Sequence, residues 1–227
     1  MLHLDFDYNM QIESAYIITI KNHPVSENMS ARCQHSLRAL EMPYKVWDAY
    51  DGTSGELVVP EHSRNSEFMS WIKWTDKELS MTEVAVALSH ISLWAHCITI
   101  DRPIVILEHD AIMLKKLSVH PVPGLILYLG GYEQVKKGWP QILTPPHATN
   151  GNNHHFICRA HAYAIDPWSA KNLFSHVLRY GIHESLDIMI RADIFPQIQT
   201  DVYAYEEPDL VNTTIVGRKK TIDGNER

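Results

Sequence analysis

The stretch "PIVILEHDAIM", residues 103–113, decides the fold prediction. Its first five residues, 103–107, are apolar and mostly β-branched, which is typical of a strand buried on both faces. Glu108, His109 and Asp110 follow directly, and the chain then becomes apolar again. A buried strand that ends in two carboxylates predicts a sheet whose edge carries polar chemistry.

Strand and helix patterns alternate along the rest of the chain. Short β-branched or alternating runs predict strands over residues 14–20, 44–50, 124–130, 154–165 and 197–205. Apolar spacing and capping residues predict helices over residues 26–42 with Ser26 as N-cap, 80–100 with a Ser80–Glu83 capping box, 166–181 with Asp166 as N-cap, and 183–194. This alternation predicts an α/β sandwich with a mostly parallel sheet, in which ligands bind beyond the carboxyl ends of the strands.

The composition suits one domain, which we expect over residues 1–227 with a core at about 15–216 and a polar tail at 217–227. The formal net charge of −7 disfavours non-specific binding to nucleic acid. The three cysteines lack CxxC spacing and the N-terminus lacks a secretory signal, so we expect reduced thiols and a cytoplasmic location. No apolar run approaches the roughly 20 residues that span a bilayer, so we expect no transmembrane segment.

The carboxylates of Glu108 and Asp110 have two interpretations. Carboxylate oxygens are hard ligands that suit Mg²⁺ or Mn²⁺, and such a metal can bridge phosphate oxygens and make a diphosphate a better leaving group. The alternative is a hydrogen-bonded turn in which Asp110 caps the following residues and Glu108 is solvated. These three residues alone favour the turn.

Longer segments favour the metal site. They are "AYIITIKNHPVSENMSARCQHSLRALEMPYKVWDAYDG" (15–52), "LSMTEVAVALSHISLWAHCI" (79–98), "PIVILEHDAIM" (103–113), "AHAYAIDPWSAKNLF" (160–174), "ESLDIMI" (184–190) and "VYAYEEPDLVNTT" (202–214). In this order they resemble glycosyltransferase family 25, which contains lipooligosaccharide and collagen galactosyltransferases. The chain departs from the family pattern at Val84 and Ala85, where small residues are usual, and at His109, where an acidic residue is usual.

The resemblance implies a single-domain GT-A fold, which is Rossmann-like, a UDP-sugar donor, and Mn²⁺ or Mg²⁺ as cofactor. Asp110 then corresponds to the direct metal ligand, and Glu108 contacts the metal or the ribose. His109 occupies the middle position, whose side chain is the least directly engaged. Because an imidazole can also bind Mn²⁺, we include His109 among the candidate metal ligands.

The resemblance also assigns residues to the donor pocket, namely His90, Arg32 and Ile18 together with Glu108. His90 belongs to the "SH" pair of the family's helix, and the alternative is a packed histidine that bonds a neighbouring carbonyl. Arg32 matches the arginine of the first helix, where it would meet a phosphate or the uracil. The alternative for Arg32 is a solvated position on the helix surface.

Two acidic residues are candidates for catalysis. Glu184 and Asp187 are three residues apart and share a helix face. By resemblance, Asp187 is the site aspartate that takes a proton from the acceptor hydroxyl or holds the donor sugar. The alternative for Asp187 is an ion pair with Arg191.

Three other segments carry polar residues that need an interpretation. Residues 53–79 are polar and irregular, and they form either a mobile loop over the site or an excursion packed down by Trp71 and Trp74. His154, His155 and His161 cluster in the sequence, but we expect no complete metal site there, because the adjacent strand residues 154 and 155 face opposite ways. The basic residues Arg218, Lys219 and Lys220 form a solvated tail or close over a diphosphate.

These observations predict a metal-dependent glycosyltransferase that moves galactose or glucose from a UDP-sugar to a hydroxyl acceptor, such as a lipooligosaccharide sugar. A viral-type enzyme that glycosylates hydroxymethylated bases in DNA is an alternative, although the acidic charge weighs against it. Two further alternatives are a metal-dependent phosphoesterase that uses the same carboxylates and an inactive module that binds sugar nucleotides.

Overall fold

The computed structural model describes residues 12–74, 78–118, 121–130, 141–143, 160–192 and 194–206. Its centre is a seven-stranded sheet in the order β2-β1-β3-β7-β5-β8-β6, and β4 pairs with β9 in a second, two-stranded sheet. The strands are β1 (Ala15–Thr19), β2 (Tyr44–Asp48), β3 (Ile104–Glu108), β4 (Ala111–Met113), β5 (Ile126–Tyr128), β6 (Gln141–Leu143), β7 (Ala162–Ile165), β8 (Gln197–Gln199) and β9 (Ala204–Glu206). The helices are α1 (Pro24–Ala39), α2 (Glu67–Ser70), α3 (Met81–Ile100), α4 (Pro167–Tyr180) and α5 (Leu186–Met189), with a 3₁₀ turn at Glu61–Ser63.

The central sheet is mixed, with one dominant direction. β1 is parallel to β2 and β3, and β5 is parallel to β8, whereas β7 is antiparallel to β3 and β5, and β6 is antiparallel to β8. β2, β1, β3, β5 and β8 therefore run one way, and β7 and β6 run the other. The prediction of a mostly parallel sheet in an α/β fold is confirmed.

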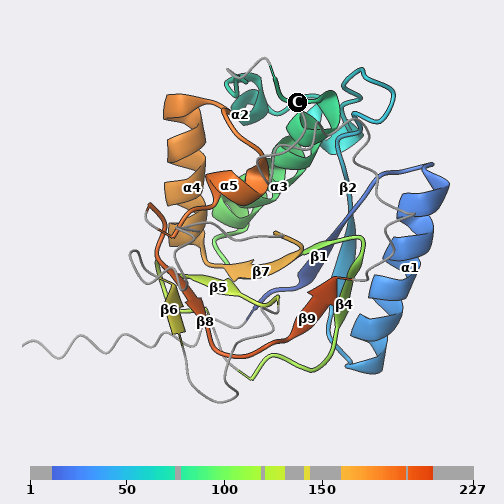
Figure 1. Ribbon diagram of the computed structural model, residues 1–227, viewed down its shortest axis with the longest axis vertical. Helices are drawn as coiled ribbons and strands as arrows, with labels where there is room; N and C mark the ends of the chain where they lie inside the picture. The colour runs from blue at the N-terminus through green and yellow to red at the C-terminus, as the bar shows by residue number, and fades with distance from the viewer. Residues whose placement is uncertain are drawn as a thin grey trace, which may run out of the picture.

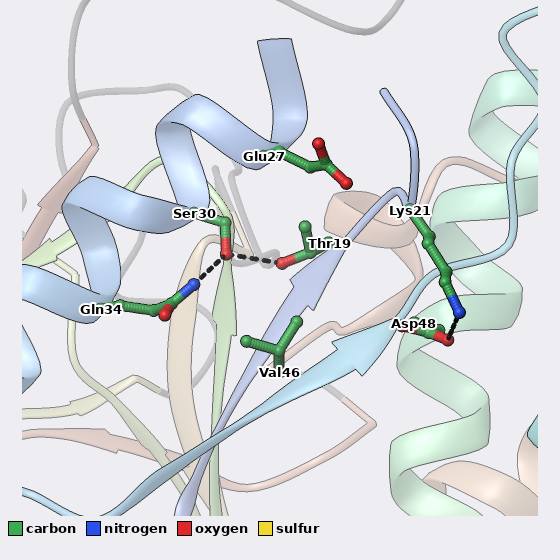
Figure 2. A pocket seen from close by; sticks show the side chains of 7 residues that line it. All are labelled: Thr19, Lys21, Glu27, Ser30, Gln34, Val46 and Asp48. Carbon is green, nitrogen blue, oxygen red and sulfur yellow. Dashed lines mark hydrogen bonds and ion pairs between the residues drawn. The ribbon is translucent and has the colours of Figure 1, made fainter. Parts of the chain in front are cut away.

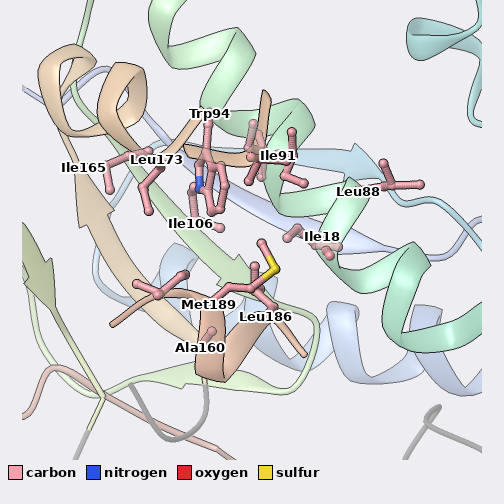
Figure 3. Close-up of a cluster of buried hydrophobic side chains, with 14 of the residues drawn as sticks. Ile18, Leu88, Ile91, Trp94, Ile106, Ala160, Ile165, Leu173, Leu186 and Met189 are labelled. Atoms are coloured by element: carbon pink, nitrogen blue, oxygen red, sulfur yellow. The ribbon is translucent and has the colours of Figure 1, made fainter. Parts of the chain in front are cut away.

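The alternation of side chains along the central strands builds a core on each face of the sheet. Ile18 and Ile106 point to the face covered by α3 and α4, where they pack in one cluster with Trp94 (Figure 3). Ile17 and Leu107 point to the other face and pack against the buried side of α1. Figure 1 shows α1 on the opposite side of the sheet from α3 and α4, so the fold has three layers.

Helix α3 begins as predicted. Ser80 is its N-cap, and Ser80 and Glu83 form the reciprocal capping box. The apolar spacing that predicts this helix suggests one stripe of Val84, Leu88, Ile91, Ala95 and Ile98, but the helix is buried around most of its circumference between the sheet, α4 and the 53–74 segment. By length and composition α3 is also apolar enough to cross a membrane, contrary to our expectation, but 61% of that window is buried inside the structure, as in a core helix.

Helix α1 begins earlier than predicted. Pro24 occupies the first turn, and the N-cap is His23, whose side chain accepts from the Ser26 N–H. Ser26 is therefore not the N-cap. It is buried, and its hydroxyl accepts the backbone N–H of Ile20 at 2.9 Å, which ties the start of α1 to the end of β1.

The C-terminal elements are shorter than predicted. Helix α5 ends at Met189, because Ile190 adopts a ψ of 81° and buries its side chain in the core. The strand predicted over residues 197–205 divides into β8 and β9, which belong to different sheets. Between them the carbonyl of Leu129 accepts the N–H groups of Tyr203 and Ala204, which leads the chain from one sheet to the other.

The 53–74 segment is anchored by Ile72, which is buried, whereas Trp71 and Trp74 are 49% and 47% exposed. The segment is therefore not packed down by its tryptophans. Gly52, at its start, approaches α3 so closely that a Cβ there would lie 2.2 Å from the Met81 carbonyl oxygen. This close approach holds the start of the segment against α3.

Candidate functional site

The candidate site begins where β3 ends. Glu108 is the last residue of this strand and pairs in register with Ile18 of the neighbouring β1. The side chain of Ile18 is buried in the core on the α3 side, so it supports the floor of the site and does not project toward a ligand. The carboxylate of Glu108 lies on this same face of the sheet.

A chain of hydrogen bonds runs from the core to Glu108. The indole N–H of Trp94 donates to the Tyr163 hydroxyl at 2.9 Å, and this hydroxyl lies 2.8 Å from Nδ1 of His90. On the other side of the ring, Nε2 of His90 lies 3.3 Å from a carboxylate oxygen of Glu108. Because an indole can only donate, the Tyr163 hydroxyl keeps its own proton for His90.

The chain defines the state of His90. Nδ1 accepts from Tyr163, so Nε2 carries the proton and donates it to the Glu108 carboxylate. Burial lowers the pKa of His90 to about 3, so the ring is neutral at neutral pH, as this arrangement requires. His90 thereby orients Glu108 without neutralising its charge. His90 is fully packed, as the alternative interpretation expects, but its partners are a hydroxyl and a carboxylate and not a backbone carbonyl. Its role in a donor pocket stays a prediction.

Helix α5 brings Asp187 to the same cluster. Its carboxylate accepts the backbone N–H of Ala160 at 3.0 Å, and its negative charge acts on the buried ring of His90. Glu184 lies one turn earlier along the chain, just before α5, and among the described residues its Oε2 is buried without a hydrogen-bond donor. The two predicted catalytic acids therefore lie in one segment beside the end of β3.

His109 lies toward the opposite face of the sheet from Glu108. Its Nδ1 is 3.2 Å from the hydroxyl of Ser26 at the start of α1. Burial, with a smaller effect of the nearby His23, lowers the pKa of His109 to about 4, so its ring is neutral at neutral pH. Asp110 is also on this side, because its charge adds to the effect of burial in raising the pKa of the Cys33 thiol in α1 to about 12.

The three predicted metal ligands do not form a closed cage. In the described part of the chain, no group of three or more His, Cys, Asp or Glu side chains is arranged to hold a metal ion. A cation such as Mg²⁺ often takes only one or two carboxylates and completes its shell with substrate phosphates and water. Glu108 and Asp110, at the end of one strand, are donors of the type that this second mode needs. The metal stays a prediction.

A polar pocket of about 220 Å³ lies between α1 and the ends of β1 and β2 (Figure 2). It is lined by Thr19, Lys21, Glu27, Ser30, Gln34, Val46 and Asp48. Lys21 and Asp48 form an ion pair of 3.8 Å across its mouth. Arg32 lies exposed on α1 and is not part of this lining.

His161 lies next to Glu108, because its backbone carbonyl accepts the Glu108 N–H at 2.8 Å. His161 is buried and packs edge-on against the ring of Tyr128. His154, His155 and the basic residues at 218–220 lie outside the described residues.

Residues 12–120 match the family described as glycosyltransferase family 25 (LPS biosynthesis protein). This range contains β1 to β4, α1 to α3, His90 and the whole Glu108–Asp110 stretch. Over these residues, just under half of the chain, the protein is similar to glycosyltransferase family 25. A search of curated proteins found no match.

The "SH" pair and the "LEHD" stretch both lie within the matched residues, and the structure brings them into direct contact through His90 and Glu108. The sequence interpretation gave Trp94 and Tyr163 no place in the site and gave Ser26 only a capping role, although each bonds to a site histidine or to its partner. The spacing of His90 and Trp94 was the available signal, because residues four apart share a helix face.

We expect His109→Asp, which restores the acidic residue usual in family 25, to keep donor turnover within about tenfold, or roughly 1.4 kcal/mol. Within the described residues the neutral ring of His109 bonds a serine hydroxyl, and a carboxylate there is favourable near the N-terminus of α1. Steady-state rates of donor hydrolysis check this. A loss much larger than tenfold means that the imidazole itself is needed, for instance as a metal ligand.

Proposed function

We propose that this glycosyltransferase transfers a hexose, galactose or glucose, from a UDP-sugar to a hydroxyl acceptor such as a sugar of lipopolysaccharide. The family 25 match indicates the transferase class and the link to LPS biosynthesis. The nature of the donor, the metal and the acceptor are our proposal.

The observation that carries the proposal is the buried chain from Trp94 through Tyr163 and His90 to Glu108. A structural turn needs no such support, whereas a site that holds a charged ligand needs its acidic groups fixed in place. His90 donates its proton to Glu108, so the carboxylate keeps its negative charge and a defined orientation. The charge can then meet a cation or the ribose hydroxyls of a nucleotide.

In this proposal the acidic residues around the end of β3 have separate roles. Glu108 and Asp110 would hold Mn²⁺ or Mg²⁺, which when bound supplies positive charge to the diphosphate leaving group. Asp187 is the candidate base for the acceptor hydroxyl, because it lies beside His90 and accepts only a backbone N–H among the bonds described here. Glu184 is placed to assist Asp187 from the preceding turn.

A thermal-shift screen tests the donor. We expect UDP with Mn²⁺ to raise the melting temperature, since a ligand that binds only the native state stabilises it, and a concentration of 100 times Kd contributes about 2.7 kcal/mol. GDP and CMP with the same metal should give little change. Equal shifts with all three nucleotides contradict the UDP assignment.

A further inference from the structure

An exposed aromatic surface lies on the flank of the molecule formed by α2 and α4. Phe68, Trp71, Trp74, Leu178 and Tyr180, which we call the aromatic rim, are 50%, 49%, 47%, 42% and 49% exposed. Large side chains of this kind are normally buried, so a group of them on one surface indicates a binding face.

The rim is built on two segments that contact each other. The ring of Phe68 packs edge-on against Trp71 at 5.5 Å and against the buried Phe174 of α4 at 6.1 Å. The backbone of the 72–74 segment pairs with the end of α4, where the Ile182 N–H donates to the Lys73 carbonyl at 2.7 Å. Figure 1 shows α2 and the end of α4 that leads to α5 at the same end of the molecule.

The charges around the rim oppose the charge of the whole chain. Lys73 and Arg179, each next in sequence to a rim residue, are exposed, whereas Glu67 is the exposed acid of the two rim segments, residues 66–74 and 178–182. The Arg179 guanidinium lies over the ring of Tyr180 at 5.2 Å. The complete sequence carries a net charge of −7, so this flank is a local cationic surface on an acidic protein.

We propose that the aromatic rim docks the protein on an anionic lipid bilayer. Trp and Tyr rings favour the headgroup region, Phe and Leu reach the acyl boundary, and Lys and Arg bind anionic headgroups. A sugar platform would use the ring faces but would gain nothing from Leu178 or the two cations, and a self-association surface would not need the cations. The rim also continues into the segment that carries Asp187, so docking would present the site to a lipid-anchored glycan. Only that last statement rests on the proposed function.

Vesicle sedimentation with the full chain tests the docking surface without nucleotide or acceptor. We expect binding to vesicles of phosphatidylcholine with phosphatidylglycerol, weaker binding at high salt, and weaker binding still to phosphatidylcholine alone. Trp71→Ser should lower the affinity on the order of tenfold. Leu178→Ser should act in the same direction, and Lys73→Glu should lower binding to the anionic vesicles only.

The matched control is Trp168→Ser. Trp168 is 64% exposed on the first turn of the same helix, roughly 15 Å from Leu178 along the axis. The Trp168→Ser variant should bind vesicles like the unmodified protein, and melting temperatures should show that every variant is folded.

The proposal is overturned if the protein does not sediment with anionic vesicles or if Trp168→Ser loses as much affinity as Trp71→Ser. It is equally overturned if Trp71→Ser changes only self-association or only the binding of a soluble glycan. Donor hydrolysis in solution should be the same in Trp71→Ser, so failure of docking is separable from failure of the proposed activity.

Discussion

Asp110→Asn should lower metal-dependent release of UDP from a UDP-sugar by on the order of a hundredfold, or about 3 kcal/mol, with an unchanged melting temperature. Strand β3 is buried and ends two residues before Asp110, so it fixes the backbone there. The substitution therefore alters the side chain and leaves the sheet in place. Asparagine keeps the shape and polarity but removes the negative charge that a hard cation requires. The developing charge on the departing diphosphate would then lack its partner.

Asp101→Asn is the matched control for this prediction. Asp101 precedes β3 as Asp110 follows it, and it is exposed in the left-handed conformation at the end of α3, which asparagine also adopts readily. It should retain full turnover. A folded but destabilised Asp110→Asn protein that turns over donor normally would show that Asp110 only caps a turn.

Tyr163→Phe should lower the free energy of unfolding by roughly 2–4 kcal/mol, because it leaves two buried polar groups without a partner. The hydroxyl accepts from the Trp94 indole and donates to His90, and all three side chains are fully buried. Donor turnover should also fall, on the order of tenfold, because His90 no longer holds Glu108 in one orientation. Urea denaturation and the hydrolysis rate, measured on the same preparation, check both effects.

The control is Tyr44→Phe, which removes a hydroxyl whose main partner is the exposed guanidinium of Arg38. It should change stability by less than about 0.5 kcal/mol. If Tyr163→Phe is as stable and as active as Tyr44→Phe, the buried chain has no role in orienting Glu108.

Elements with local signals were predicted correctly from the sequence. The Ser80–Glu83 capping box defines the start of α3, and Asp166 with Pro167 defines the start of α4. The three-residue strands β4 and β6 were missed, because each is held by a distant partner, β9 and β8 respectively. The reversed direction of β7 was also missed, since a buried strand has the same residue pattern in either direction.

The site was predictable where it depends on one strand and its family pattern. Glu108 and His90 were assigned to one site, and the structure joins them by a hydrogen bond. Tyr163 was missed because it is 73 residues from His90 and on an antiparallel strand, so no spacing rule connects them. The bond from His109 to Ser26 was missed because Ser26 was expected to cap α1, and its burial follows only from the earlier helix start.

Product analysis after incubation with UDP-galactose or UDP-glucose and Mn²⁺ tests the central claim most directly. A glycosyltransferase without acceptor slowly breaks the bond between the sugar and the diphosphate, and we predict UDP and free hexose, with no such products from Asp110→Asn. A phosphoesterase that uses the same carboxylates breaks a phosphate bond and gives UMP and a sugar phosphate. Formation of UMP and sugar phosphate, or an absence of turnover with every nucleotide sugar, would contradict the assignment of the Glu108–Asp110 site to glycosyl transfer.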